Sequence, residues 1–397
     1  MDVFAQLSSG DAVLKIVDMH TCGEPTRIVI QGFPSLSGVS LLQKRASAKA
    51  HHDDIRQRLM LEPRGHHDMY GAILVSETEE KEADIGVLFC HNEGFSTMCG
   101  HATIALGRFL IDTHDLNIFP NRDRVVFDPA SRTSLLKLHA PCGLVQVSIP
   151  TLPPSQNFPL RSDPSRPVSF ESVPSFVAVR DLVVTLPINR QWPQLISSQR
   201  DIVRIDIAYG GAFYALVTAQ ELGFSSGLCS PSTIAQFDHA TRLLKMHVQE
   251  TSEYSAFVVH PTEPDLGFLY SVIVVDQKGP TSELGLCFFA DQELDRSPTG
   301  SGVCARVALA IAKHERDLFE NYEYHSVVSH KAGAGSFVGT AIERTTLQGT
   351  GRHFGRQWDA VKVRVSGNAF YTSCSTMVLE RGDSLSASGF TLSLPEN

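Results

Sequence analysis

Two stretches of the chain that lie 200 residues apart repeat the same order of features. In the first stretch, Gly86-Val-Leu-Phe-Cys90 precedes Thr97-Met-Cys-Gly-His-Ala102. In the second, Leu286-Cys-Phe-Phe-Ala290 precedes Ser297-Pro-Thr-Gly-Ser-Gly302. Each consists of a β-type run, a short loop that contains a glycine, and a long apolar pattern with helical spacing. The repeat constrains the fold, because it indicates that one strand–loop–helix unit occurs twice.

A second pair of segments supports a duplication. Asp18-Met-His-Thr-Cys-Gly23 matches Asp206-Ile-Ala-Tyr-Gly-Gly211 with a shift of 188 residues. Coincidence between two common strand–loop–helix units is the alternative explanation. We predict an α/β (α+β) protein with two pseudo-symmetric halves, residues 1–199 and 200–397, that meet around a shared cleft. The boundary is expected within Gln191–Arg200, and the C-terminal strands could return to the first half.

Hydrophobic periodicity predicts the elements around the repeat. Three helices are expected, at Lys44–Met60, Gly100–Asp112 and Gly302–His314. The expected strands are short β-type runs: Leu14–Val17, Arg27–Ile30, Ile73–Val75, Gly86–Phe89, Leu144–Ile149, Val177–Leu186, Ile202–Ala208, Phe213–Val217, Leu269–Val275 and Leu286–Phe289.

Composition and charge narrow the classes of function. Hydrophobic residues make up 42% of the chain and charged residues 19%, which is typical of a globular protein with a sizeable core. The net charge of −9 argues against a general nucleic-acid surface and against a polybasic membrane patch. No run approaches the ~20 apolar residues of a membrane span. A small anionic substrate is still allowed, because a local site can be positive on a negative protein.

The eight cysteines favour a reducing compartment. No two of them form a C-x-x-C pair, which argues against a zinc ribbon and against a thioredoxin-like site. The first residues, Met-Asp-Val-Phe-Ala-Gln, lack the basic start and the apolar stretch of a signal peptide. Free cysteines without a signal sequence predict a cytoplasmic protein.

Each repeated helix is predicted to begin at a loop that a strand delivers. Thr97 and Ser297 are suitable N-caps, and Pro298 suits the first helical position. Cys99 and Thr299 would then fall in the first turn. Unpaired N–H groups and the helix dipole make such a helix start attract an anion. Two helix starts that face each other could clamp one carboxylate.

Several side chains near these helix starts are candidates for chemistry. Cys99 could act as a base or nucleophile, since a helix start favours the thiolate form, and a purely structural cysteine is the alternative. His101 could hold a substrate amine or tune the thiol, or be an ordinary surface histidine. Asp295 could accept hydrogen bonds from a substrate ammonium, or cap a turn. Gly100 and Gly300 would let a ligand approach the backbone closely.

No metal ion or cofactor is expected. Two stretches contain residue types that bind metals: His51, His52, Asp53, Asp54, His66, His67 and Asp68. Adjacent residues on a helix point in different directions, and these stretches lack an i, i+4 zinc pattern. Gly333-Ala-Gly-Ser336 lacks the Gly-Lys-Thr continuation of a P-loop, and Gly210-Gly211 is expected to mark a turn.

Five segments that span most of the chain resemble the proline racemase family, and they occur in family order. The segments are Asp18-Met-His-Thr-Cys-Gly-Glu-Pro-Thr-Arg27, Leu61-Glu-Pro-Arg-Gly-His66, Met98-Cys-Gly-His101, Asp206-Ile-Ala-Tyr-Gly-Gly-Ala-Phe-Tyr214 and Asp295-Arg-Ser-Pro-Thr-Gly-Ser-Gly302. The resemblance implies two similar α/β domains of the diaminopimelate-epimerase type, an active site in the inter-domain cleft, and no cofactor. It also implies a small imino-acid substrate similar to hydroxyproline.

The family resemblance also assigns roles to residues. In its racemases and epimerases two cysteines act from opposite faces of the substrate ring. The first corresponds to Cys99, whereas the second corresponds to Thr299, so the chain departs from that pattern. Another departure is Cys22, where many relatives carry glycine, and His260 could also line the pocket. The resemblance implies that Cys99 is catalytic and that the substrate is bound by Gly100, His101, Asp295, Thr299, Gly300 and Ser301.

A cysteine at the first position and a threonine at the second is similar to the pair in the family members that dehydrate trans-3-hydroxy-L-proline. Inverting Cα needs a base on one ring face and an acid on the other, and an unassisted threonine hydroxyl is too weak for either. Dehydration of trans-3-hydroxy-L-proline is a syn elimination, so one group could serve both steps. The Cys99 thiolate could remove the Cα proton, and the resulting thiol or a nearby acid could protonate the departing hydroxide. We therefore expect a hydro-lyase that forms pyrroline-2-carboxylate. The alternatives are a proline racemase or hydroxyproline epimerase, and a non-catalytic amino-acid binding protein. We expect no nucleic-acid or membrane partner, and a homodimer is compatible with the sequence.

Overall fold

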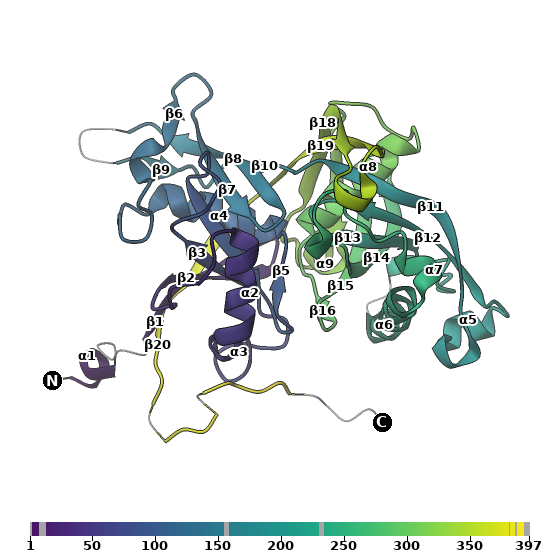
Figure 1. Ribbon diagram of the computed structural model, residues 1–397, viewed down its shortest axis with the longest axis horizontal. Helices are drawn as coiled ribbons and strands as arrows, with labels where there is room; N and C mark the ends of the chain where they lie inside the picture. The colour runs from purple at the N-terminus through teal and green to yellow at the C-terminus, as the bar shows by residue number, and fades with distance from the viewer. Residues whose placement is uncertain are drawn as a thin grey trace. The chain divides into compact units, whose positions relative to one another are not determined.

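The computed structural model of the protein describes residues 2–7, 13–154, 159–229, 234–380, 382–385 and 387–392. The chain forms two compact units (Figure 1). Unit 1 comprises Met1–Phe170 and Asn368–Asn397, and unit 2 comprises Glu171–Gly367.

Strand pairing explains why this division differs from the predicted boundary at residues 199 and 200. Strand β11 (Ser175–Thr185) pairs antiparallel with β12 (Ile202–Tyr209), so both sides of the predicted boundary belong to unit 2. Strand β20 (Ala369–Met377) returns to unit 1 and pairs antiparallel with β1 (Leu14–Thr21). Hydrogen bonds between distant strands therefore decide which unit each segment joins.

The elements of unit 1 surround one apolar helix. Its helices are α1 (Val3–Leu7), α2 (Leu41–His51), α3 (Asp53–Met60), α4 (Gly100–Asp112) and the short 3-10 helix η1 (Arg122–Arg124). Besides β1 and β20, its strands are β2 (Glu24–Gln31), β3 (Gly71–Val75), β4 (Ile85–Cys90), β5 (Phe95–Ser96), β6 (Val126–Asp128), β7 (Thr133–Ala140), β8 (Gly143–Leu152) and β9 (Arg161–Ser162). Strand β10 (Val168–Glu171) spans the division between the units.

Unit 2 has a corresponding set of elements. Its α-helices are α5 (Pro193–Ser197), α6 (Ile234–Glu250), α7 (Ser252–Ser255), α8 (Gly300–Ala312) and α9 (Val327–Ala332). Its 3-10 helices are η2 (Ile188–Arg190), η3 (Gly227–Cys229), η5 (Pro264–Leu266) and η6 (Gly351–His353). Besides β11 and β12, its strands are β13 (Phe213–Thr218), β14 (Leu269–Gly279), β15 (Ser282–Phe289), β16 (Glu293–Leu294), β17 (Tyr322–Ser326), β18 (Phe337–Gln348) and β19 (Gln357–Gly367).

The two units repeat one pattern of strand pairing. In unit 1, β1–β2 is antiparallel, β2–β3 parallel, β3–β4 antiparallel, β4–β7 parallel and β7–β8 antiparallel. In unit 2 the same sequence of pairings runs through β12–β13, β13–β14, β14–β15, β15–β17 and β17–β18. The strands of unit 2 close into a ring, because β18 pairs with β19 and β19 pairs with β11. The predicted pseudo-symmetric α/β architecture is confirmed.

One apolar helix is the core of each unit. Helix α4 contacts β1, β2, β8 and β20 in unit 1, and α8 contacts β11, β12, β18 and β19 in unit 2. Both helices are buried almost all round, as expected for helices with few polar residues. Their first residues, Gly100 and Gly300, lie 200 positions apart, so the shift seen in the sequence is the spacing of the two central helices.

The expected elements agree with the structure except at some ends. Nine of the ten expected strands lie within observed strands, and Val177–Leu186 extends one residue beyond β11. The helix expected at Gly302–His314 begins and ends two residues earlier. The helix expected at Lys44–Met60 is wrong in one respect, because it is broken at His52, where φ is −137° and ψ is 21°. Within the described part of the chain, none of the helices has the length and hydrophobicity that crossing a membrane requires.

Candidate active site

Cys99 is the N-cap of helix α4. Its backbone is extended, with φ −145° and ψ 115°, and its Sγ accepts a hydrogen bond from the amide of Ala102 at 3.4 Å. The prediction that Thr97 caps this helix is wrong, since the helix begins at Gly100. The thiol thus occupies the place where an N-cap oxygen usually satisfies an orphan amide.

His101 lies beside this thiol. Cys99 Sγ is 3.2 Å from Nδ1 and 3.5 Å from Nε2 of the imidazole. Burial lowers the pKa of His101 to about 3, and a hydrogen bond to the backbone of Pro25 opposes this only in part. The imidazole is therefore neutral at neutral pH and can accept a hydrogen bond from the thiol. This geometry matches the hypothesis that His101 tunes the thiol, and it excludes the alternative of a surface histidine.

Other buried groups hold the His101 segment. The hydroxyl of Thr21 donates to the His101 carbonyl at 2.9 Å. The ring of Tyr70 meets the His101 ring edge-on, with 4.7 Å between centroids, and its hydroxyl lies 2.5 Å from Ser96 Oγ. Tyr70 is not among the predicted site residues, because it lies 31 residues before His101 and outside the segments that resemble the family. Cys22 is buried in the β1–β2 turn with a positive φ of 52°, a conformation that favours glycine.

Thr299 occupies the equivalent position before helix α8, but its backbone is different. It has φ 62° and ψ 86°, in the left-handed region, and its side chain makes no cap hydrogen bond. A β-branched residue in this region is strained by about 1–3 kcal/mol. Ser297 and Pro298 were predicted as N-cap and first helical residue, and both predictions are wrong. Both residues precede the N-cap, Thr299, and Ser297 Oγ accepts a hydrogen bond from the Thr299 amide at 3.2 Å.

The Thr299 hydroxyl is bonded to Asp295. Thr299 Oγ1 donates to Asp295 Oδ2 at 2.7 Å, and the Ser297 amide donates to Asp295 Oδ1 at 2.8 Å. Burial raises the pKa of Asp295 to about 6, although hydrogen bonds from Thr299 and Ser297 oppose the rise. The carboxylate retains acceptor capacity, because its two oxygens offer about four lone pairs. The alternative that Asp295 only caps a turn does not account for its bond to Thr299.

Two further buried groups lie near this helix start. The hydroxyl of Tyr214 lies 2.7 Å from Ser301 Oγ, and both side chains are buried. The thiol of Cys287 lies 3.1 Å from Ser271 Oγ. Burial raises the pKa of Cys287 to about 12, and the nearby Asp295 raises it further, so this thiol stays protonated. Tyr214 is the last residue of a segment that resembles the family, whereas Cys287 lies in none of these segments.

Gly210 is needed for close packing beside the same helix. A Cβ at Gly210 would lie 2.1 Å from the Ser301 carbonyl and 2.6 Å from the Ala305 amide. Gly210 and Gly211 form the turn between β12 and β13, as predicted, and Gly211 has a positive φ of 106°. The β12–β13 turn can therefore lie directly against the first turn of α8.

The remaining candidates lie outside these two helix starts. Burial lowers the pKa of His260 to about 4, and the contacts described for its ring are with Thr262, Glu263, Phe176 and Tyr209 rather than the start of α8. In the first of the two stretches rich in His and Asp, Asp53 accepts a hydrogen bond from Arg56. In the second, His67 Nδ1 lies 3.0 Å from Asp68 Oδ1. Among the described residues, no group of three or more His, Cys, Asp or Glu side chains could hold a metal ion.

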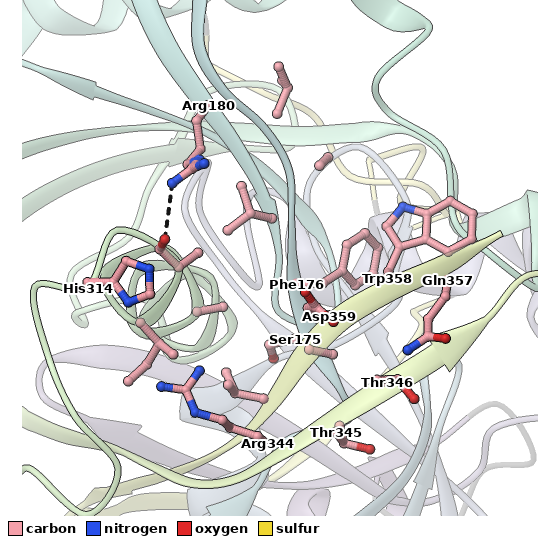
Figure 2. Close-up of a pocket in the computed structure, with 18 residues that line it drawn as sticks. Ser175, Phe176, Arg180, His314, Arg344, Thr345, Thr346, Gln357, Trp358 and Asp359 are labelled. Atoms are coloured by element: carbon pink, nitrogen blue, oxygen red, sulfur yellow. Dashed lines mark hydrogen bonds between the residues drawn. The ribbon is translucent and has the colours of Figure 1, made fainter.

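A cavity of about 820 Å³ in unit 2 lies at the other end of α8 (Figure 2). Strands β11 and β19 pair at Ser175–Val361 and Phe176–Ala360, and the cavity opens beyond these pairs, where the two strands diverge. Figure 2 shows Arg180 at its edge, donating to the Ala312 carbonyl at 3.0 Å. Because α8 is 13 residues long, this end is about 18 Å from its first residue. The cavity contains none of the predicted site residues.

Comparison with known proteins gives consistent matches. A family model described as proline racemase matches residues 16–391. The chain is 41% identical over 389 residues to a Homo sapiens protein named trans-3-hydroxy-L-proline dehydratase, covering 96% of each protein. It is 37% identical over 357 residues to a Colwellia psychrerythraea protein of the same name, covering 89% of this chain and 86% of that protein.

Solved structures show the same fold. The chain is similar to a hydroxyproline epimerase from Agrobacterium vitis with bound trans-4-hydroxy-L-proline, with a TM-score of 0.75 and 96% of both chains covered. It is equally similar to a probable proline racemase from Agrobacterium radiobacter with bound carbonate, again with a TM-score of 0.75. Both are 21% identical in sequence, so these two likenesses establish the fold alone.

Proposed function

The chain belongs to the proline racemase family, and from this premise we propose that it is a hydro-lyase that dehydrates trans-3-hydroxy-L-proline. Full-length relatives at 37–41% identity carry the name of that activity. Within the structure, the observation that supports the proposal most directly is the bond from Thr299 to Asp295. It occupies the helix start at which the isomerases of the family have their second thiol.

Cys99 is the proposed base. As a thiolate, Sγ takes the proton from Cα, and the electron pair of the broken C–H bond moves toward the substrate carboxylate. His101 stays neutral because burial keeps its pKa at about 3, so it can accept a hydrogen bond from Cys99 in the thiol form but does not retain the substrate proton itself. The charge that develops on the carboxylate is stabilised by N–H donors placed to meet it.

The second step breaks the bond between C3 and its hydroxyl oxygen. In trans-3-hydroxy-L-proline the Cα hydrogen and the hydroxyl lie on the same ring face. The proton that Cys99 has taken can therefore return to the departing hydroxide, which leaves as water. The electron pair forms the C2–C3 double bond, and the resulting enamine tautomerises to pyrroline-2-carboxylate. Atoms and charge balance without an external oxidant or reductant.

At the second helix start, neither the Thr299 hydroxyl nor the Cys287 thiol is suited to protonating the opposite ring face. The Thr299 hydroxyl already donates to Asp295, and an alcohol is a far weaker acid than a thiol. The nearby Cys287 thiol is buried, and its pKa of about 12 makes it a poor acid at neutral pH. These groups favour elimination over inversion, so the racemase and epimerase alternatives are not favoured.

Substrate binding is proposed for the residues that begin both helices. The first-turn amides of Gly100, His101, Gly300 and Ser301 would hold the substrate carboxylate, as helix starts commonly hold anions. Asp295 would accept a hydrogen bond from the ring nitrogen, and Thr299 would line the same site. A homodimer, a cytoplasmic location and independence from cofactors stay predictions.

The function is tested by incubating the pure protein in D2O with trans-3-hydroxy-L-proline, trans-4-hydroxy-L-proline and L-proline separately. Pyrroline is trapped with o-aminobenzaldehyde, and inversion is followed by optical rotation. We expect pyrroline from the 3-hydroxy compound alone. Inversion without dehydration would refute the lyase in favour of an isomerase. Binding by calorimetry without turnover would instead favour a binding protein.

A further inference from the structure

The strained backbone at Thr299 persists because several contacts hold it. The Thr299 carbonyl accepts from the Val303 amide at 2.7 Å, and its amide donates to Ser297 Oγ at 3.2 Å. The hydroxyl donates to Asp295 at 2.7 Å. These contacts fix Thr299 itself, but the peptide that enters it from Pro298 needs its own support, because rotation there would release the positive φ.

That support comes from Arg306, on the second turn of α8. Its Nη2 donates to the Pro298 carbonyl at 2.6 Å, and its Nη1 donates to Glu283 Oε1 at 2.8 Å. The guanidinium also lies over the ring of Tyr324, with Cζ 4.7 Å from the centroid. Arg306 is 4% exposed, so these bonds are screened little by water.

The surroundings are shaped for an arginine. A Cβ at Gly285 would lie 2.8 Å from Arg306 Nη1, so this glycine leaves the space that the guanidinium fills. Two donors on a rigid fork can reach Pro298 and Glu283 together, whereas a lysine ammonium is a single point on a flexible stem. Unit 1 has no equivalent, because the residue 200 positions earlier is Leu106.

We infer that Arg306 is a positioning residue for the reaction, which holds the Pro298 carbonyl and thereby keeps Thr299 in its left-handed backbone conformation. With this bond in place, the Thr299 hydroxyl stays on Asp295 and the first turn of α8 keeps the shape proposed to bind substrate. The kinetic part of this inference rests on the proposed function. The backbone part does not depend on any substrate.

The kinetic test compares two variants. Arg306→Met combined with Glu283→Gln removes the bond to Pro298 without leaving a half-buried unpaired carboxylate. Glu283→Gln alone is the matched control, since Arg306 can still hold Pro298. At a temperature where circular dichroism shows all proteins folded, we expect kcat/KM to fall about 10- to 100-fold in the double variant and about threefold or less in the control.

A second readout separates positioning from a general loss of stability. A misplaced substrate should lose its Cα proton more often than it completes elimination, so in D2O the double variant should leave more Cα deuterium in recovered trans-3-hydroxy-L-proline per pyrroline formed. Arg306→Lys should lie between wild type and the double variant. A folded double variant with the kinetics and deuterium ratio of Glu283→Gln would overturn the inference.

The backbone test needs no substrate. The double change at Arg306 and Glu283 is introduced into Thr299→Ala and Thr299→Gly backgrounds, which both lack the hydroxyl but differ in their tolerance of positive φ. The loss in urea midpoint should be clearly smaller in the alanine background, because releasing Pro298 lets alanine relax its strained positive φ, whereas glycine has no strain to relieve. Equal losses would overturn the inference. If wild type fails to dehydrate the substrate, the proposed function fails, while this experiment still decides the role of Arg306.

Discussion

Cys99 and Thr299 occupy the same position in the two units, yet they begin their helices in opposite ways. Cys99 is extended, with φ −145°, and its sulfur faces the helix, where it accepts the Ala102 amide. Thr299 is left-handed, with φ 62°, and its hydroxyl is turned away from the helix amides to donate to Asp295. Duplication of a fold thus preserved the strand–loop–helix path but not the direction in which the functional side chain points.

The side chains beside Cys99 and Thr299 also differ between the two units. In unit 1 the thiol has the neutral imidazole of His101 beside it, and the position 200 residues before Asp295 is Phe95. In unit 2 the place of His101 is taken by Ser301, and the hydroxyl has a buried carboxylate beside it. The first helix start therefore holds a proton acceptor for a thiol, whereas the second holds an acceptor for an alcohol. This difference supports the proposal that the base acts from the first helix start.

The largest expected effect is at the first helix start. Cys99→Ser should lower kcat by about 1,000-fold, because a serine hydroxyl can cap the helix but is a far weaker base under the assay conditions. The rate of pyrroline formation measures this directly. Cys374→Ser, at an exposed thiol on β20, is the control and should leave the rate unchanged. Full activity of Cys99→Ser would refute the proposed base.

A thiol at the second helix start should make the two starts chemically alike. In Thr299→Cys, dehydration should fall about tenfold, because a charge-assisted hydrogen bond to Asp295 is lost. The same variant should begin to invert Cα of L-proline or trans-4-hydroxy-L-proline, which chiral chromatography would detect. Faster dehydration in this variant would contradict the assigned role of the hydroxyl.

The two starts should respond to acid with opposite signs. His101 has a pKa of about 3 in the folded protein and about 6.5 when unfolded, so its contribution to stability is lost as pH falls below about 6.5. Asp295 has a folded pKa of about 6 and an unfolded value near 3.8, so its contribution grows as pH falls from about 6 to 4. Urea unfolding across this range should show less acid sensitivity in His101→Gln and more in Asp295→Asn.

For both variants and for wild type, the free energy of unfolding at pH 7 is the reference from which the change at lower pH is measured. His260, whose pKa is about 4, acts in the same direction as His101 and should leave part of the acid sensitivity in His101→Gln. An unchanged slope in both variants would show that neither group carries the difference between the units.

The smallest effects are expected from a matched pair of tyrosines. Tyr70→Phe removes the contact with Ser96, and Tyr214→Phe removes the contact with Ser301, each at a cost of about 1 kcal/mol in the free energy of unfolding. Because Ser301 is proposed to bind substrate, Tyr214→Phe should also raise KM, whereas Tyr70→Phe should change it less. Equal changes in KM would argue against a binding role for Ser301.

Much of the fold could be predicted because it depends on local patterns. Apolar spacing located the helices that begin at Gly100 and Gly300, and runs of β-formers located ten of the strands. The cap residues were mispredicted because Thr97 and Ser297 have good cap propensity, while the actual helix boundary depends on packing of the whole unit. The boundary expected at residues 199 and 200 differs from the observed division because β11 pairs with β12 and β19, whereas the return of a C-terminal strand to the first half was allowed in the prediction.

Residue order alone predicted two related halves with Cys99 and Thr299 at equivalent positions, and the resemblance to the proline racemase family implied that Thr299 stands where a second thiol is missing. Covalent order and residue identity are sufficient for those conclusions. The left-handed backbone of Thr299, its hydrogen bond to Asp295 and the hydrogen bond from Arg306 to the Pro298 carbonyl became visible only in the folded structure. These depend on φ and ψ and on buried hydrogen bonds, which are set when the strands and the central helix pack and water is excluded.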